Sequence, residues 1–338
     1  MPATLASIAA DLGVSRTTVS NAYNHPDQLS PALRRRILAH AKAKGYAGPN
    51  PHARSLRTSR TATIGVVLTE QLSFAFEDRA SVDFLAGVAK RSDYSLTLIP
   101  TGVSVHDAIV DGYIIYSVPA QAQMLIDAHS RDLPLIICDQ PVDVPGVPYV
   151  GIDDAAAIAP AAEDLVRAGH TRVGILTKRL FSAPKNGPVT PGELEAADLH
   201  VQRARVRGAL DVFAAAGIAD VPLVARDLND VDSAADGARE LLEAHPDLTA
   251  ILCTTDSMAL GVLEYCRGRR RVPEELSVTG FDGIGVDGLS TVAQPTQRKG
   301  ETAAMLLRAA MNGRPQRQER IILPTQYLPG RTVREPAR

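Results

Sequence analysis

The sequence has little cysteine, and its three cysteines, Cys138, Cys253 and Cys266, lie far apart in the chain. Such spacing fits buried thiols in a reducing compartment better than a disulfide framework or a zinc site. No apolar run approaches the roughly 20 residues that a membrane-spanning helix needs. The N-terminus also lacks the charged-then-apolar pattern of a leader peptide. We therefore expect a soluble cytoplasmic protein with no metal ion and no membrane partner.

The motifs of common enzyme classes are also missing. There is no GxSxG elbow, HExxH helix or phosphate-binding GxxxxGK pattern, and the eight histidines do not cluster at ligand spacing. Residues 283–288 do match the dinucleotide pattern GxGxxG. That pattern needs a helix to start there, whereas residues 289–295 contain β-branched residues and then a proline. The nearest acid beyond, Glu301, is too close to hold a ribose. We expect no cofactor and no enzymatic activity.

Charge is distributed unevenly along the chain. Residues 1–60 contain nine basic and two acidic side chains, a net charge of +7; because the whole chain carries −2, residues 61–338 carry −9. The length of 338 residues and the 45% hydrophobic content allow about two or three domains. A basic N-terminal segment on an acidic body predicts that only this segment meets a polyanion.

Within the basic segment, residues 5–23 predict two short helices that meet at a glycine turn. Ala9 is small enough for the helices to cross closely, Gly13 can adopt a positive φ, and Val19 packs back into the crossing. Ser15 can cap the second helix. The polar face of that helix has almost no acid, which suits the major groove of DNA.

A third helix and a hinge follow. Ser30 at the N-cap and Gly45 beyond the end bound the third helix on both sides. In residues 49–60 only Ala53 and Leu56 are apolar, too little to hold a short helix folded by itself. We predict that this segment is a hinge, which becomes helical when a partner orders it.

From residue 63 onward, short β-branched runs alternate with segments of helical length. This pattern predicts parallel sheets covered on both faces, and two successive series predict two similar lobes. The expected strands are 63–68, 95–99, 112–116, 133–138, 172–176, 221–225, 249–253 and 276–280. The expected helices are 79–90, 103–110, 120–131, 155–168, 201–216, 233–244, 257–267 and 300–311. The apolar run 321–323 belongs to one lobe or the other.

Six segments together resemble the LacI/GalR family of bacterial transcription regulators, over essentially the whole chain. They are IAADLGVSRTTVS at 8–20, ARSLR at 53–57, IGVV at 64–67, GHTRVG at 169–174, TDSMALG at 255–261 and LSVTGFD at 276–282. Their order and spacing make the match far more specific than any one segment.

The resemblance implies an N-terminal all-α helix-turn-helix headpiece with a hinge helix, followed by a two-lobed α/β core like that of periplasmic binding proteins. The expected divisions are a headpiece at 1–48, a hinge helix at 49–60 and a core at 61–338, with lobe one at 62–149 and 294–322 and lobe two at 150–293 and 323–338. An effector cleft between the lobes and a side-by-side homodimer are also implied. Tetramers of the resembling family use a C-terminal helical zipper. Residues 331–338 have no heptad pattern for such a zipper, so we expect a dimer.

The DNA-contacting candidates are polar residues of the headpiece and three residues of the hinge. Arg16 could pair with a guanine edge, Thr17 could touch a thymine methyl, and Asn21 could pair with adenine; the alternative for each is a phosphate contact. In resembling proteins, paired hinge leucines enter the minor groove, whereas the alternative for Leu56 is packing on the first strand. The complete set is Thr4, Ser15, Arg16, Thr17, Thr18, Ser20, Asn21, Asn24, Ala53, Arg54 and Leu56.

The effector-binding candidates lie where core strands end. Asp139, Thr255 and Asp282 follow apolar strands, the edge at which open α/β sheets bind ligands, and Arg205 lies three residues before a glycine. Acids and an arginine suit the hydroxyls of a polyol; the alternative is ordinary acids in turns that cap the next helix. Phe74 and Phe76 could stack on a sugar or purine ring, or pack between the lobes.

These patterns predict a ligand-responsive, sequence-specific DNA-binding regulator, a homodimeric repressor of sugar or related catabolic genes whose partners are operator DNA and a sugar-like effector. One alternative is a small-molecule binding protein with a vestigial headpiece. Another is a regulator that has lost its effector. The loop at 178–199, which contains proline and glycine, either closes over the cleft or is partly disordered.

Overall fold

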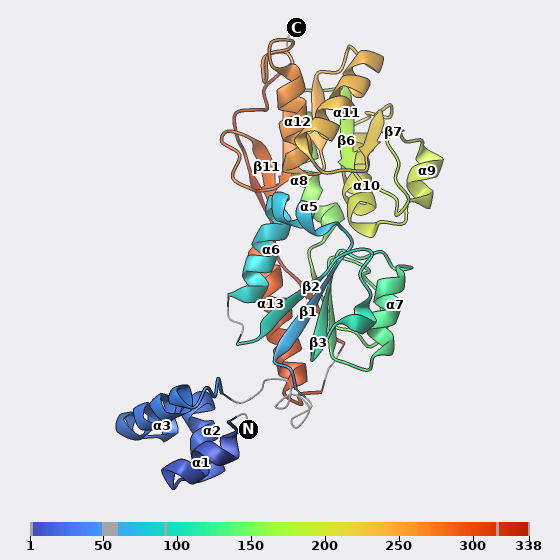
Figure 1. Cartoon of the computed structure of the whole chain (residues 1–338). Coiled ribbons are helices and arrows are strands. Elements are labelled where there is room, and N and C mark those ends of the chain that lie inside the picture. The colour runs from blue at the N-terminus through green and yellow to red at the C-terminus, as the bar shows by residue number, and fades with distance from the viewer. Residues whose placement is uncertain (1–2, 49–59, 91–92, 316–317, 337–338) are drawn as a thin grey trace. The chain divides into compact units, whose positions relative to one another are not determined.

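The computed structural model describes residues 3–48, 60–90, 93–315 and 318–336. The chain divides into two compact units, Met1–Thr61 and Ala62–Arg338. Figure 1 shows both units with their helices and strands labelled. The predicted hinge helix, with Ala53, Arg54 and Leu56, lies outside the described residues.

The first unit is helical. It contains α1 (Leu5–Leu12), α2 (Arg16–Asn24), a 3₁₀ turn at Pro26–Gln28 and α3 (Pro31–Ala43). Gly13 ends α1 with a φ of +65°, a conformation that favours glycine and turns the chain into α2. The predicted packing is confirmed, because the small apolar core consists of Ile8, Ala9, Val19, Ala22, Ile37 and Ala41.

The second unit begins with a six-stranded sheet in the order β12-β5-β4-β3-β1-β2. All its strand pairs are parallel, and the core strands are nearly continuous apolar runs, as expected for a sheet buried on both faces. Its strands are β1 (Thr63–Leu68), β2 (Ser95–Ile99), β3 (Gly112–Tyr116), β4 (Leu135–Cys138), β5 (Tyr149–Gly151) and β12 (Arg320–Ile322).

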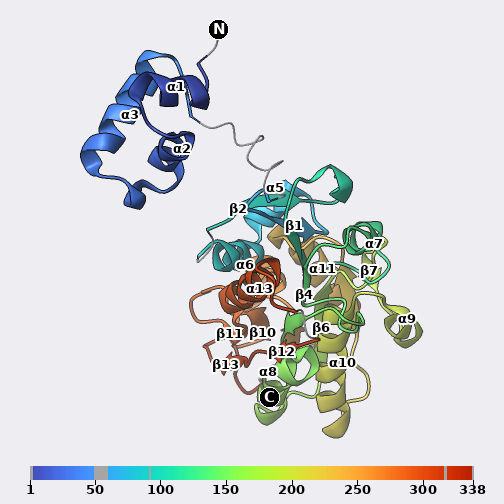
Figure 2. The same cartoon turned by 90° about the horizontal axis from the view of Figure 1, so that it is seen from below.

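Helices α6 (Arg79–Ala89) and α13 (Thr296–Met311) lie side by side against one face of this sheet (Figure 2). Glycine allows their close approach: a Cβ on Gly300 would lie 2.3 Å from the carbonyl oxygen of Phe84. Helix α7 (Gln123–Ser130) covers the other face, and the short α5 (Leu72–Glu77) precedes α6.

The second sheet has seven strands in the order β13-β11-β10-β9-β6-β8-β7, with the two edge strands β13 and β7 antiparallel. Its strands are β6 (Val173–Lys178), β7 (Gly187–Pro188), β8 (Leu223–Arg226), β9 (Ala250–Cys253), β10 (Ser277–Asp282), β11 (Ser290–Ala293) and β13 (Gln326–Leu328). Its helices are α8 (Asp154–Arg167), α9 (Pro191–Ala196), α10 (His200–Ala215), α11 (Val231–Ala244) and α12 (Asp256–Cys266).

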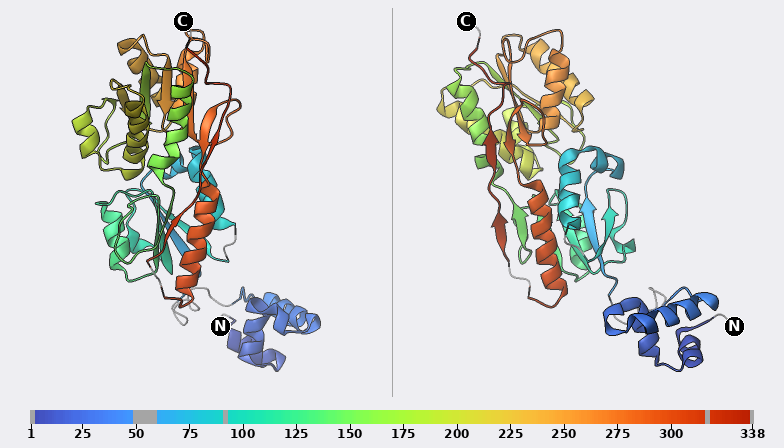
Figure 3. Two further views of the ribbon diagram at one scale, coloured as in Figure 1. Left: turned by 180° about the vertical axis from the view of Figure 1, so that it is seen from behind. Right: turned by 90° about the vertical axis from the view of Figure 1, so that its left-hand side faces the viewer.

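Each sheet with its helices forms one lobe, and the chain passes between the lobes three times (Figure 3). The connections lie between β5 and α8, between β11 and α13, and between β12 and β13. Helices α8 and α10 cover one face of the second sheet, and α11 and α12 cover the other. None of the helices in the described part of the chain has the length and apolar character that a bilayer span requires.

The structure differs from one sequence prediction and describes a loop whose order the sequence left open. The helix expected at 103–110 is only a 3₁₀ turn, Val105–Asp107, because the segment between β2 and β3 also contains a turn at Gly102, whose φ is +82°. The loop at 178–199 is ordered. Its helix α9 begins with a capping box: the hydroxyl of Thr190 accepts a hydrogen bond from the amide of Glu193, and the carboxylate of Glu193 accepts one from the amide of Thr190. Lys185 forms an ion pair with Glu193.

Candidate functional site

The predicted DNA-contacting residues of the headpiece lie mainly on α2 and at its start. Ser15 caps this helix by accepting a hydrogen bond from the Thr18 amide at 3.0 Å, which confirms the predicted cap. Arg16 and Thr17, in the first turn, are exposed. Thr4 caps α1 in a capping box with Ser7. The first turn of α2 therefore presents two side chains to an approaching ligand from a fixed helix start.

Other candidates on α2 already have partners within the headpiece. The Asn21 side-chain amide donates to Oε1 of Gln28 at 2.8 Å. The amide of Asn24 donates to both the carbonyl oxygen and Oγ of Ser20, each at 3.1 Å. Gln28 lies in the 3₁₀ turn after α2. Nothing in the local sequence pairs it with a residue seven positions earlier.

The headpiece also neutralises one of its two acids. Oδ2 of Asp11 lies 3.0 Å from Nε2 of His40 and 3.1 Å from Nζ of Lys44. These hydrogen bonds hold the pKa of Asp11 below its ordinary value. The pair leaves the net charge of +7 on residues 1–60 unchanged, and a basic segment of this kind suits a polyanion.

The second candidate site is a cleft between the two lobes of the core. Its walls come from both sheets and are mostly polar: the lining includes Asp78, Asp139, Arg205, Asn229, Thr255 and Asp282. The enclosed space is small, about 60 Å³. Ligand pockets are typically about 300–1,000 Å³, so a ring-sized ligand requires movement of the side chains or of the lobes.

Arg205, on α10, is the central cation of the cleft and is buried. Its Nε donates to Asp154 at 2.8 Å, and its Nη1 donates to the carbonyl oxygen of Thr254 at 2.9 Å and to Asp282 at 3.3 Å. The guanidinium also lies over the ring of Phe281, 3.7 Å from the centroid. These contacts fix the guanidinium in one orientation.

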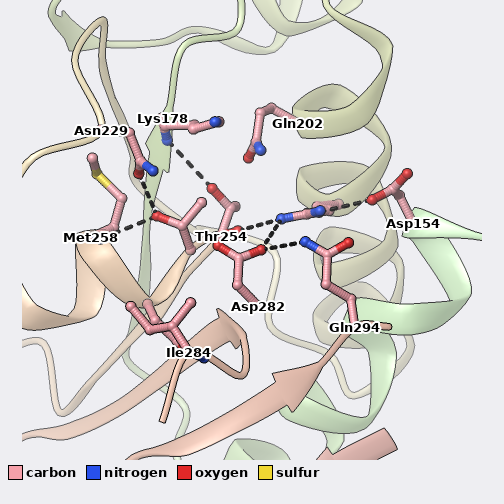
Figure 4. Close-up of polar contacts among 12 residues, drawn as sticks. Asp154, Lys178, Gln202, Asn229, Thr254, Met258, Asp282, Ile284 and Gln294 are labelled. Atoms are coloured by element: carbon pink, nitrogen blue, oxygen red, sulfur yellow. Dashed lines mark hydrogen bonds and ion pairs between the residues drawn. The ribbon is translucent and has the colours of Figure 1, made fainter. Parts of the chain in front are cut away.

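Asp282 is the last residue of β10 and has a φ of +114°, which is strained for any residue but glycine. Its Oδ1 accepts a hydrogen bond from Nε2 of Gln294 at 2.6 Å, and Figure 4 shows this amide directed at the carboxylate. Burial raises the pKa of Asp282 to about 7, although Arg205 opposes the shift. Strain and a raised pKa at one residue are typical of a functional site.

Asp139 occupies the corresponding place in the first lobe, directly after β4. Its φ is +66°, and its Oδ1 accepts a hydrogen bond from Nζ of Lys299 at 2.6 Å. The phenol of Tyr149 donates to its backbone carbonyl at 2.9 Å. Both lobes therefore end a central strand in a buried carboxylate that lines the cleft.

Thr255 caps α12 and belongs to a chain of polar contacts that reaches the first lobe. Its hydroxyl donates to Oδ1 of Asn229 at 2.7 Å, and the amide of Asn229 lies 3.4 Å from Oδ1 of Asp78. Asp78 in turn caps α6 by accepting from Ser81. The cleft thus joins the starts of two helices, one in each lobe.

Comparisons with known proteins agree with this architecture. The family described as "Periplasmic binding protein-like domain" matches residues 162–333. The HTH-type transcriptional regulator IpsA of Corynebacterium glutamicum is 50% identical, over 98% of this chain and 97% of its own. The chain belongs to the LacI family of transcriptional regulators. It is a DNA-binding transcriptional regulator.

Two solved structures extend the comparison. A LacI-family regulator from Corynebacterium glutamicum is 46% identical to this regulator, with a TM-score of 0.76, over 98% of this chain and 99% of that one. The complex of the regulator CelR with cellobiose is 26% identical, with a TM-score of 0.68, over 98% and 99% of the two chains. A protein named CelR comes from Thermobifida fusca and is 32% identical over 96% of each chain.

The structure brings four of the six predicted effector residues of the regulator together in the cleft: Asp139, Arg205, Thr255 and Asp282. The structure does not bring Phe74 and Phe76 into this group, and their stacking on a ligand ring stays a prediction. Neither lines the cleft, Phe76 is 58% exposed, and the residue of α5 that does line it is Ala75.

No helix begins at the GxGxxG pattern of residues 283–288, as predicted. The carboxylate of Asp256 accepts hydrogen bonds from the amide of Ile284 at 2.9 Å and the hydroxyl of Thr291 at 2.6 Å. Strand β11 follows at Ser290, so no helix begins there. No group of residues able to hold a metal ion occurs in the described part of the chain.

Proposed function

We propose that this regulator is a homodimeric repressor of sugar or related catabolic genes, controlled by an uncharged, hydroxyl-rich effector that binds in the interlobe cleft. The observation that carries the proposal is the pair of buried carboxylates, Asp139 and Asp282, which end a central strand in each lobe and line one cleft. Carboxylates at such a point accept hydrogen bonds from hydroxyl groups of a ligand.

The charge balance of the cleft supports an uncharged effector. Arg205 already has Asp154 and Asp282 as partners, and Lys299 has Asp139. A charged ligand that paired with Arg205 or Lys299 would have to displace one of these buried acids, which leaves a buried charge without that partner at a cost of several kcal/mol. The other two cations of the lining, Lys178 and Arg179, both face Glu70. Hydroxyl groups can instead add to the remaining acceptor positions. The complex of CelR with cellobiose gives a precedent within the family.

For the DNA, we propose that Arg16 and Thr17 read bases in the major groove of each half of a near-palindromic operator. The exposure of both side chains at the capped start of α2 supports this role. The other contacts proposed are those of Thr4, Ser15, Thr18, Ser20, Asn21 and Asn24. Ala53, Arg54 and Leu56 complete the set as a minor-groove contact at the operator centre, which two subunits would supply together.

The proposed organisation follows from these roles: a headpiece at 1–48, a hinge at 49–60 and a core from 61 onward. Since β5 extends to Gly151, the first passage between lobes is proposed to follow that residue. We further propose that the regulator acts in the cytoplasm, without catalytic activity, cofactor or membrane partner.

Two experiments test the proposal. Selection from a random DNA pool, followed by sequencing, should enrich an inverted repeat, and enrichment of no sequence would contradict a DNA-reading headpiece. A thermal-shift screen with hexoses, pentoses, disaccharides, polyols, sugar phosphates and nucleosides should find a stabilising ligand among the uncharged hydroxylated compounds. Stabilisation by sugar phosphates alone would overturn the effector class, and no stabilisation by any compound would favour a regulator that has lost its effector.

The variant Asp282→Ala should lose the thermal shift, while Asp211→Ala, an exposed acid on α10, should keep it. Size-exclusion chromatography with light scattering tests the dimer. A monomer that binds the selected operator with full affinity would contradict the homodimer.

A further inference from the structure

Lys299 is a buried lysine to which neither the DNA contacts nor the effector contacts assign a role. It lies in the first turn of α13 and is 1% exposed. Burying an ammonium group costs several kcal/mol unless hydrogen bonds and an opposite charge compensate. Its Nζ has two such partners, Oδ1 of Asp139 at 2.6 Å and Oε1 of Gln294 at 2.8 Å. Both partners line the effector cleft.

Lys299 determines the orientation of the Gln294 side-chain amide. An ammonium group can only donate hydrogen bonds, so the side-chain oxygen of Gln294 must face Lys299 and the nitrogen must face the other way. That nitrogen meets Oδ1 of Asp282 at 2.6 Å. Because Arg205 donates to the same oxygen, Asp282 has two donors on Oδ1. Among the described residues, no hydrogen bond to its Oδ2 occurs.

We propose that Lys299 is a positioning residue of the effector site: it fixes the amide of Gln294 with its nitrogen toward Asp282 and so holds Asp282 in the cleft as an ionised hydrogen-bond acceptor. The chain of bonds runs from Asp139 in the first lobe, through Lys299 and Gln294, to Asp282 in the second. It makes the carboxylates of both lobes acceptors, so the effector that fits is one that donates hydroxyl hydrogens to each lobe. This last step rests on the proposed function, whereas the orientation of Gln294 does not.

Other groups also act on Asp282, and the test must separate them from Lys299. Arg205 on α10 and Lys178 at the end of β6 favour its ionised form. Asp256 on α12 and Asp78 before α6 oppose it. A direct effect of the Lys299 charge on the pKa of Asp282 would be present whether or not Gln294 is there. An effect through Gln294 would vanish with that side chain.

The experiment is a carboxyl ¹³C NMR titration of the ligand-free, full-length protein labelled at the aspartate Cγ. The resonance of Asp282 is assigned by its absence from Asp282→Asn. Four proteins are compared: the parent, Lys299→Met, Gln294→Leu and the double variant. Lys185→Met, which removes a lysine that pairs with Glu193, is the matched control.

In Lys299→Met the pKa of Asp282 should rise by about one unit, since a hydrogen bond to the charged form is lost. Gln294→Leu should give a similar rise, and Lys299→Met should add nothing to it in the double variant. The control should titrate as the parent does. An unchanged midpoint in either single variant would overturn the proposal, and so would a full second shift in the double variant, which would indicate a direct charge effect.

If Lys299→Met does not fold, the Gln294→Leu titration still decides whether the amide sustains the ionised form. The titration needs no effector. A failure to find any ligand therefore contradicts the proposed function and leaves the orientation of Gln294 to be judged by this result alone.

Discussion

The substitution Asp282→Asn should stabilise the ligand-free protein. Asparagine has nearly the same shape as aspartate, and its Oδ1 can accept the same hydrogen bonds from Arg205 and Gln294. What the substitution removes is a buried negative charge. Arg205 faces two buried acids, Asp154 and Asp282, so its pairing with Asp154 survives.

The magnitude follows from the raised pKa of Asp282. Folding moves it from an ordinary 3.8 to about 7. At 1.36 kcal/mol for each unit, holding this carboxylate ionised in the folded protein costs about 4 kcal/mol above pH 7. A group with a raised pKa binds a proton more tightly in the folded state, so its cost appears as the pH rises from about 4 to about 7. Asp282→Asn should therefore be more stable than the parent by about 2–4 kcal/mol at pH 8 and by much less at pH 5.

Differential scanning calorimetry at the two pH values measures the effect. For a core of this size, about 2 °C in melting temperature corresponds to 1 kcal/mol, so the expected gain at pH 8 is about 4–8 °C. Asp211→Asn, an exposed acid on α10, serves as control and should change little at either pH. An equal difference between parent and Asp282→Asn at pH 5 and pH 8, or a less stable variant at pH 8, would refute the reasoning.

Three further predictions concern the DNA contacts and the helix packing. Arg16→Ala should weaken binding to the selected operator by about 1–3 kcal/mol and relax base choice, measured by fluorescence anisotropy over a salt series; equal losses on operator and scrambled DNA would indicate a phosphate contact instead. Gln28→Ala should change the preferred base at the same operator position as Asn21→Ala in sequenced DNA selections, because the two amides are hydrogen-bonded; an unchanged preference would exclude the coupling. Gly300→Ala should destabilise the core in urea unfolding by about 1–3 kcal/mol or more, because its Cβ would lie 2.3 Å from the Phe84 carbonyl oxygen; unchanged stability would show that the two helices can move apart freely.

Most of the core strands could be predicted because each is a short apolar run between clear breaks. The bounds of β1, β2 and β3 are those expected from the sequence. The strands that the sequence did not indicate, such as β7 and β11, have two to four residues, and their pairing depends on neighbours far away in the chain. A short segment forms a strand only when a partner supplies its hydrogen bonds.

The residues proposed for the effector site also differ in how far the sequence predicts them. Asp139, Thr255 and Asp282 could be found because they follow apolar strands, and the carboxyl ends of parallel strands meet at one edge of a sheet. Lys299 and Gln294 could not. A lysine in a helix ordinarily faces solvent, and only the approach of α13 to Asp139 in three dimensions reveals that this one is buried.

Several polar contacts join the two lobes beside the cleft. Arg179 and Lys178 in the second lobe lie 3.6 and 3.9 Å from Glu70 in the first, and the amide of Val201 donates to Gln140 at 3.1 Å. Each such contact contributes about 0.5–1.5 kcal/mol, while a typical allosteric coupling is about 1–3 kcal/mol. Replacing two of them with bonds to a ligand would therefore be enough to shift the balance between lobe arrangements. Because all these contacts line or border the cleft, an effector there reaches them directly and needs no long pathway through the core.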